Sequence, residues 1–112
     1  MTNTEVAKQL LVAWTTGDFA TVDAVIAESI DFVGPLGHTT GAAAYAKGIR
    51  EFAALIDRAE IEVAFGDGEN VCIIYDLVTK AGAKAPTAGH YRIVDGKVAM
   101  VRAYFNPALL KL

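Results

Sequence analysis

The sequence predicts an α+β fold, in which N-terminal helices pack on a curved, mostly antiparallel sheet formed by the C-terminal half. Two observations carry this prediction. Apolar residues recur every three or four positions in the first half, as on the buried face of a helix, and from residue 60 onward polar and apolar residues alternate as in strands. With 112 residues, no internal repeat and no low-complexity linker, the chain is expected to form a single domain over residues 1–112.

Three helices are predicted before residue 57. Thr2 and Glu5 have capping-box spacing, and the first helix is expected to run to about Thr16. Gly17 is expected to end it and Asp18 to cap the second helix. The apolar stripes are Val6, Leu10, Ala13 and Trp14 in the first helix, Phe19, Val22, Val25 and Ile26 in the second, and Tyr45, Ile49, Phe52 and Ile56 in the third.

The strands are predicted from β-branched and aromatic runs bounded by Gly, Pro, Asn or Asp. They are Ile30 to Val33, Glu60 to Phe65, Val71 to Thr79, His90 to Val94 and Lys97 to Phe105. The segment from Lys80 to Gly89 is rich in Gly, Pro and Ala and is interpreted as a ten-residue loop.

Asp95-Gly96 predicts a two-residue type I′ turn, because this turn needs a positive φ at both central residues. A regular hairpin around it pairs Val94 with Lys97, Arg92 with Ala99, and His90 with Val101. His90 and Arg92 would then share one side of the sheet with Ala103 and Phe105. The opposite side would carry Tyr91, Ile93, Val98, Met100, Arg102 and Tyr104. Because that outer side is largely apolar, a second copy is expected to cover it, giving a homodimer.

Composition argues against several classes of partner. The net charge is −3 and no run of Lys or Arg occurs, so nucleic acid is not expected. The two histidines and one cysteine lack the spacing of a metal site, and Cys72 has no partner for a disulfide within the chain. No apolar run approaches the ~20 residues of a membrane span, and the first residues lack a signal-peptide layout. A cytoplasmic protein without metal, cofactor or membrane partner is therefore expected.

The chain resembles the SnoaL-like branch of the nuclear transport factor 2-like superfamily, which includes polyketide cyclases, ketosteroid isomerases and limonene-epoxide hydrolases. The resemblance rests on three segments spread over nearly the whole chain: Trp14-Thr-Thr-Gly-Asp-Phe19, Asp31-Phe-Val-Gly-Pro35, and Val94-Asp-Gly-Lys-Val98 followed by Arg102-Ala-Tyr-Phe105. It implies a cone-shaped fold, in which a long helix crosses the concave face of the sheet and a pocket lies between them.

The resemblance carries over little of the chemistry of these enzymes. The general-base aspartate of ketosteroid isomerases falls on Gly34, their oxyanion tyrosine at about Leu10, and their second acid near His90. The Asp-Arg-Asp set of limonene-epoxide hydrolases finds Arg92 and Asp76, but no second carboxylate. The family's fold is thus implied more strongly than any of its reactions.

His90, Arg92 and Asp76 are the candidate catalytic residues. His90 would exchange a proton near neutral pH, and Arg92 would stabilise developing oxyanion charge. The alternative is that both residues have structural roles. His90 would then be a buried histidine hydrogen-bonded to a Tyr or Asp side chain, and Arg92 would be paired with a carboxylate of this chain. The sequence leaves open whether Ile73, Tyr75 and Leu77 or Ile74, Asp76 and Val78 face the pocket, and the resemblance favours Tyr75 inward. If Asp76 faces outward, Arg102 is its expected partner.

The candidate substrate-binding residues are those that would line a pocket suited to a flat, mostly apolar ligand: Trp14, Phe32, Tyr45, Tyr75, Val101 and Phe105. Aromatic residues at helical spacing are also common in a plain core, which is the alternative for Tyr45 and Phe52. His38, in the loop after Pro35, is placed at the pocket mouth or simply in solvent.

Three functions remain at this point. The first is a cofactor-free isomerase, cyclase or hydrolase that acts by proton transfer on a hydrophobic carbonyl or cyclic compound. The second is a non-catalytic protein that binds such a small molecule in the same cone. The third is a dimerisation module whose cone is filled by its own side chains.

Overall fold

The computed structural model describes residues 1–112 as three α-helices, six strands and a C-terminal 3-10 turn. In chain order these are α1 (Asn3–Thr15), α2 (Phe19–Val25), β1 (Ile26–Gly34), β2 (Gly37–Thr40), α3 (Ala42–Ala53), β3 (Ile56–Asp67), β4 (Asn70–Thr79), β5 (Lys84–Val94), β6 (Lys97–Tyr104) and the turn η1 (Pro107–Leu110). No helix is long and apolar enough to cross a membrane.

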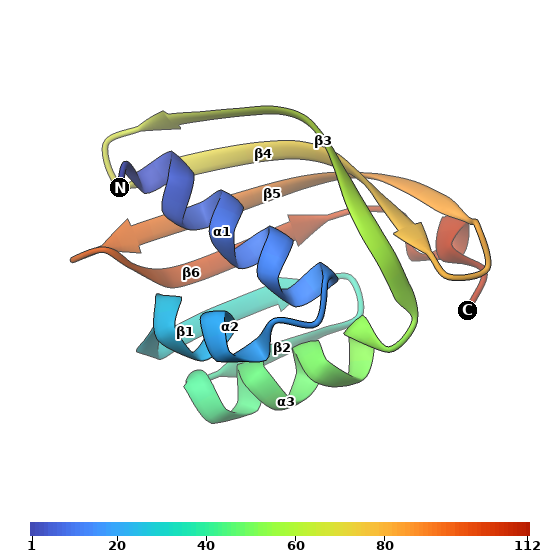
Figure 1. The fold of residues 1–112 in the computed structure, drawn as a ribbon, viewed down its shortest axis with the longest axis horizontal. Helices are drawn as coiled ribbons and strands as arrows, with labels where there is room; N and C mark the ends of the chain where they lie inside the picture. The colour runs from blue at the N-terminus through green and yellow to red at the C-terminus, as the bar shows by residue number, and fades with distance from the viewer.

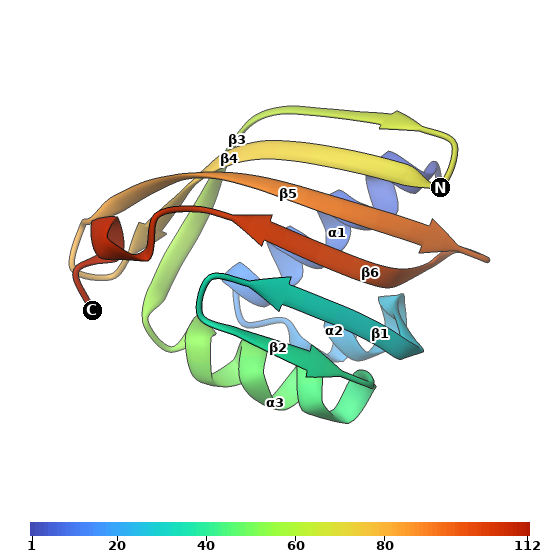
Figure 2. The ribbon, with the colours of Figure 1, turned by 180° about the vertical axis from the view of Figure 1, so that it is seen from behind.

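The six strands form one curved sheet in the order β2-β1-β6-β5-β4-β3. β1 pairs with β6 in parallel, and every other pair is antiparallel, so the sheet is mixed. α1 lies across the concave face, with α2 and α3 beside it over the β1 and β2 end (Figure 1). Seen from behind, the opposite face carries no helix (Figure 2). The fold is therefore a helix layer on one face of an otherwise open sheet.

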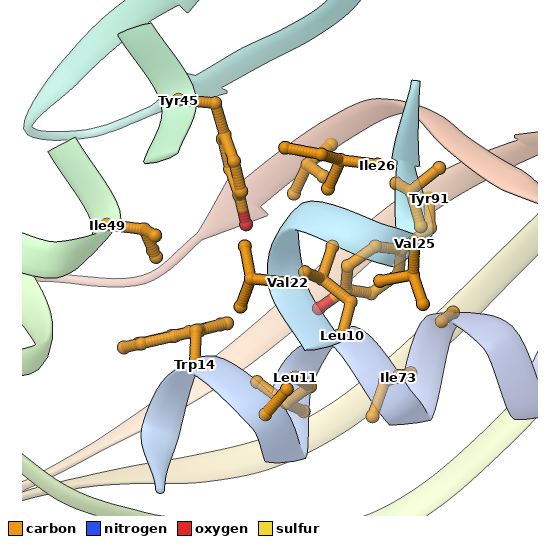
Figure 3. Close-up of a cluster of buried hydrophobic side chains, with 14 of the residues drawn as sticks. Leu10, Leu11, Trp14, Val22, Val25, Ile26, Tyr45, Ile49, Ile73 and Tyr91 are labelled. Carbon is orange, nitrogen blue, oxygen red and sulfur yellow. The ribbon is translucent and has the colours of Figure 1, made fainter. Parts of the chain in front are cut away.

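The core lies between α1 and the concave face of the sheet. It is one cluster of 23 buried hydrophobic residues. Leu10 and Leu11 of α1 and Ile73 of β4 have essentially no exposed surface. Figure 3 shows these side chains together with Trp14, also from α1, and with Tyr45 of α3, which approaches the cluster from the other side. Burial of the apolar side chains of α1 holds this helix against the sheet, since burying each large aliphatic side chain stabilises the fold by about 1.5–3 kcal/mol.

The local signals at helix ends and at the last turn are confirmed. Thr2 and Glu5 form both hydrogen bonds of a capping box, and α1 ends at Thr15. The side chain of Asp18 accepts a hydrogen bond from the Thr21 amide at the start of α2. Asp95 and Gly96 have φ values of 51° and 76°, as a type I′ turn requires.

Several element bounds differ from the prediction. α3 ends at Ala53, so Ile56 begins β3 and does not extend the helix. β1 is longer than expected, and β2 was not predicted. β5 begins at Lys84, so six of the ten residues of the expected loop belong to this strand. Its small residues alternate in burial along β5 and pair with β4, and this tertiary pairing outweighs their low β-propensity.

The register expected for the last hairpin is wrong beyond its first pairs. Val94 does pair with Lys97, but Ile93 then pairs with Val98 and Arg92 with Met100. This leaves Ala99 as one extra residue on β6, a β-bulge. A shift of one residue exchanges the two faces of a strand, so His90 lies opposite Arg102 and not opposite Val101.

Because of the bulge, the side chains of β5 lie on the opposite faces of the sheet from those expected. Tyr91 and Ile93 are buried on the helix-covered face, with Val101 and Val98 of β6. His90 and Arg92 lie on the open face, with Met100, Arg102 and Tyr104 as their neighbours on β6. In β4 the alternative with Tyr75 inward is the one found, so Asp76 lies on the open face.

Candidate ligand-binding site

Two adjoining cavities lie between α3, the β1–β2 turn and the concave face of the sheet. The outer one, which we call the vestibule, has a volume of about 250 Å³. The inner one, which we call the chamber, has a volume of about 40 Å³ and is lined only by hydrophobic residues. Five residues line both and form a neck between them: Phe32, Tyr45, Ile49, Phe52 and Phe105.

Gly34 and Gly48 both line the vestibule, but they differ in how closely other atoms approach them. Gly34 ends β1, and a Cβ there would lie 2.9 Å from Cζ of Phe32, so only glycine lets that ring lie against the turn. Gly48 lines the vestibule from α3, and a Cβ built on it would meet no atom within 4 Å. The wall also contains Glu51 and Thr39, and the Thr39 hydroxyl is buried without a hydrogen-bond partner.

The neck is held by aromatic contacts between separate elements. The Phe32 and Tyr45 rings meet edge to face, with 5.8 Å between their centroids. Phe52 packs at the same centroid distance on Trp14 of α1. Such pairs add about 0.5–1.5 kcal/mol beyond the burial of their surface. They fix α3 over the open end of the cone and thereby set the width of the neck.

Three tyrosines from three elements supply the polar atoms among the residues that line the chamber, apart from the indole of Trp14. Tyr45 belongs to α3, Tyr75 to β4 and Tyr91 to β5, and their exposed fractions are 3%, 5% and 3%. In Figure 3 the hydroxyl of Tyr45 points from α3 into the cluster.

Burial raises the pKa of all three hydroxyls, and for Tyr91 raises it well above the usual value. Interaction with Tyr75 further raises the pKa of Tyr91, and interaction with Tyr91 partly offsets the rise at Tyr75. The tyrosines are therefore protonated at neutral pH and act as hydrogen-bond donors. No carboxylate, histidine, lysine or arginine lines the chamber.

Comparison with known proteins identifies the family of this chain. The family model of the SnoaL-like domain matches residues 7–101. The chain belongs to the SnoaL-like family. No curated protein matches it.

Solved structures similar to this SnoaL-like chain share its fold over nearly the whole length. A protein from Kribbella flavida DSM 17836 is 28% identical, with a TM-score of 0.88 over 96% of this chain and 89% of that one. An NTF2-like protein from Cytophaga hutchinsonii is 24% identical, with a TM-score of 0.86 over 100% and 96% of the two chains. An LEH-like epoxide hydrolase from M. tuberculosis is 19% identical, with a TM-score of 0.83 over 97% and 86%. The last two likenesses concern the fold alone.

The SnoaL-like structure brings the expected substrate-binding residues together. Trp14, Phe32, Tyr45, Tyr75, Val101 and Phe105 all line the chamber. Sequence reasoning missed Tyr91, which it placed on the outer face. The alternation of polar His90 and Arg92 with apolar Tyr91 and Ile93 along β5 was the signal that could have placed it correctly.

The three expected catalytic residues of this SnoaL-like chain lie outside the cone. Nε2 of His90 is 2.9 Å from Oδ1 of Asn70 on the open face. Arg92 is exposed beside it. Asp76 lies between Glu60 of β3 and Pro86 of β5 in the register of the sheet. The expected position of His90 in the pocket is therefore wrong, because the bulge at Ala99 turns that face outward.

The partner expected for Asp76 is bound elsewhere. A guanidinium nitrogen of Arg102 lies 2.9 Å from Oδ2 of Asp31, at the β1–β6 junction. Oδ1 of the same carboxylate is 2.8 Å from Nε2 of His38 and accepts a hydrogen bond from Thr40 at 3.0 Å. His38 is thus a residue of β2 on the open face and not a loop residue at the pocket mouth. This cluster ties β2 and β6 to β1.

Proposed function

We propose that this SnoaL-like protein binds a small, largely apolar molecule that carries one hydrogen-bond-accepting oxygen, such as a ketone. One observation carries the proposal: the buried, protonated tyrosine hydroxyls, those of Tyr45 and Tyr75 among them, line a chamber whose other side chains are apolar apart from the indole of Trp14. A ligand oxygen that accepts hydrogen bonds from these hydroxyls gains about 0.5–1.5 kcal/mol for each neutral hydrogen bond, while hydrocarbon parts of the ligand fill the aromatic neck.

The volumes bound the size of this ligand. Pockets for drug-sized molecules run to about 300–1,000 Å³, and the vestibule reaches only about 250 Å³. The chamber, at about 40 Å³, has room for a few water-sized groups, since one water needs about 10–15 Å³ measured in this way. The ligand therefore places its oxygen-bearing end through the neck, and one or two rings or an equivalent chain remain in the vestibule.

Binding is favoured over proton-transfer catalysis by the groups within reach. General-base catalysis needs a proton acceptor within about 2.6–3.2 Å of the reacting atom or one water away. Neutral tyrosines donate protons in hydrogen bonds and do not serve as that base.

The proposed binding activity needs no cofactor. The single Cys72 is compatible with the reducing cytoplasm, where we place the protein.

A second candidate function rests on Glu51, the one carboxylate in the vestibule wall. It would act as the base of an isomerase or hydrolase on a ligand whose carbonyl is held by the tyrosines. Turnover of a bound ketone or epoxide that disappears in Glu51→Gln, while ligand affinity stays the same, would establish this candidate over simple binding.

The test of the binding proposal compares acetophenone with ethylbenzene, which has the same skeleton without the carbonyl oxygen. Calorimetric titration of the wild type is expected to show tighter binding of acetophenone. In Tyr45→Phe and Tyr75→Phe this preference should fall about 2–10-fold, because one neutral hydrogen bond contributes about 0.5–1.5 kcal/mol. Equal affinity for both compounds in the wild type, or an unchanged preference in both variants, would overturn the role of the tyrosines.

A second pair of variants locates the binding. Gly48→Leu places a side chain in open space in the vestibule and is expected to abolish binding of acetophenone. Gly48→Ala is the matched control, which leaves most of the vestibule open. Both variants should melt no lower than the wild type, because glycine is the poorer helix former by about 0.8–1.0 kcal/mol. Undiminished binding by Gly48→Leu would place the ligand elsewhere.

A further inference from the structure

Glu51 is the only charged residue among those that line the vestibule or the chamber. It is exposed on α3 and takes part in no ion pair of the structure. Lys47 lies four residues earlier on the same helix and is not paired with it. Arg102, on the other side of the β1–β2 turn, is bound by Asp31. The wall of the vestibule therefore carries one negative charge that no side chain of the protein pairs with.

The aromatic rings of the vestibule favour a positive charge in the same space. Four rings line the vestibule together with Glu51: those of Phe32, Tyr45, Phe52 and Phe105. The face of an aromatic ring is negative, so it attracts a cation, and aromatic cages bind alkylammonium groups in this way. No lysine, arginine or histidine lines either cavity, so an anionic group of a ligand would have no charged partner there.

We propose that the ligand of this protein carries an ammonium group at the end that remains in the vestibule, where it pairs with Glu51. This inference rests on the proposed function, in which the tyrosines hold an oxygen at the other end of the ligand. Tyr45 and Glu51 are six residues apart on α3, which separates their backbones by about 9 Å along the helix axis. One aromatic ring with substituents at opposite positions spans such a separation. The substrate class is therefore an amine that also carries a ketone or a similar accepting oxygen.

Two weak attractions add up in this arrangement. An exposed ion pair contributes little by itself because water and salt screen it. A cation held against aromatic rings adds a second contribution of similar size. A carboxylate in the same place gains neither and is repelled by Glu51. Glu51 acts here on the outer end of the ligand and needs no contact with a reacting carbon, so this role does not depend on its being a base.

The test uses three 4-substituted acetophenones with different outer groups. They are the cationic 4-(2-aminoethyl)acetophenone, the neutral 4-propylacetophenone and the anionic 3-(4-acetylphenyl)propanoate. In calorimetric titrations at low salt, the wild type is expected to bind the amine about 5–30-fold more tightly than the carboxylate. This ratio should fall as the salt concentration rises to about 1 M, where the screening length is only about 3 Å.

Variants of Glu51 test whether this residue causes the preference. In Glu51→Gln the ratio should fall about 2–5-fold, the effect of one exposed ion pair. In Glu51→Lys it should fall further, because a cation then takes the place of the carboxylate. The neutral 4-propylacetophenone, titrated into the same variants, corrects for any change in the shape of the vestibule. Both variants should fold, since Glu, Gln and Lys have similar helix propensities and the position is exposed.

The matched control is Glu69→Lys. Glu69 is exposed in the turn between β3 and β4, far from α3 (Figure 1), so this variant changes the net charge equally without touching the vestibule. It should keep most of the wild-type ratio. If acetophenone itself does not bind, the proposed function and this inference both fail. If acetophenone binds, an amine that binds no more tightly than the carboxylate would overturn this inference alone. So would an equal ratio in Glu51→Lys and Glu69→Lys.

Discussion

The ring of Tyr91 lies over the backbone of Gly89, two residues earlier on the same face of β5. A Cβ built on Gly89 would come within 2.7 Å of the Tyr91 hydroxyl oxygen and 2.8 Å of its Cε1. Glycine therefore makes room for the ring, and the hydroxyl extends along β5 toward the end of the cone where Gly89 pairs with Ala103. The position of the Tyr91 hydroxyl therefore depends on the absence of a side chain at Gly89.

We expect Gly89→Ala to lower the free energy of unfolding by about 1–3 kcal/mol, the usual cost of forcing an extra methyl group into a packed interior. Tyr91 is almost completely buried, and the chamber beside it has a volume of only about 40 Å³, so its ring has little space to move into. Urea unfolding monitored by circular dichroism measures the effect. Gly48→Ala is the control and should be as stable as the wild type or more stable. Wild-type stability of Gly89→Ala would show that the ring has room to shift.

Thr39→Val is expected to raise the stability by about 1 kcal/mol, because it replaces a buried hydroxyl that has no hydrogen-bond partner with a methyl group. The neighbouring Thr40→Val is the matched control. It removes a hydroxyl that donates to Asp31 at 3.0 Å and should not stabilise the protein. Thermal melting of both variants is the measurement, and a lower melting temperature for Thr39→Val would contradict the prediction.

The Asp31 cluster predicts a pH-dependent contribution to stability. Hydrogen bonds from His38, then from Thr40 and Arg102, lower the pKa of Asp31 below its usual value, although partial burial opposes the shift. A carboxylate whose pKa is lower in the folded state stabilises the protein fully above its unfolded pKa of about 3.9, and this contribution is lost as the pH falls through the folded pKa. Asp31→Asn should therefore melt below the wild type at neutral pH.

The melting difference between the wild type and Asp31→Asn should shrink as the pH falls from about 7 to about 3. Melting curves of both proteins across this range are the measurement. Asp23→Asn is the control, since Asp23 makes only an exposed ion pair with Arg50 at 3.7 Å, and such pairs contribute little. A difference that stays constant with pH would mean that the charge of Asp31 is not what stabilises the junction.

Gly96→Val is expected to destabilise the β5–β6 hairpin. Gly96 has a φ of 76°, and a residue with a Cβ pays about 1–2 kcal/mol in this left-handed region. A Cβ there would meet no atom within 4 Å, so the cost comes from the backbone and not from a clash. Gly96→Asn should cost less, because asparagine tolerates a positive φ. Equal stability of the two variants, measured by urea unfolding, would contradict this explanation.

The positions of some residues could be predicted from the sequence, and those of others could not. The inward positions of Trp14 and Tyr45 could be predicted, because their helices have one clear apolar stripe and defined ends. Tyr91 and His90 were placed on the wrong faces, because the prediction extended the register of the Asp95-Gly96 turn without a bulge. The alternation of polar and apolar residues in the sequence of β5 agrees with the burial found in the structure. For this strand, the alternation is therefore a safer guide to its faces than the register extended from the turn.

The α+β order of elements, the caps at Thr2 and Asp18, and the turn at Asp95-Gly96 could all be predicted from the sequence, since each depends on residues close in the chain. Three features became visible only in the folded protein: the extra residue at Ala99, the extension of β5 into the Gly- and Pro-containing segment, and the meeting of three tyrosines from α3, β4 and β5. These features depend on how strands pair across long stretches of sequence. A one-residue change in that pairing moves every side chain beyond it to the other face.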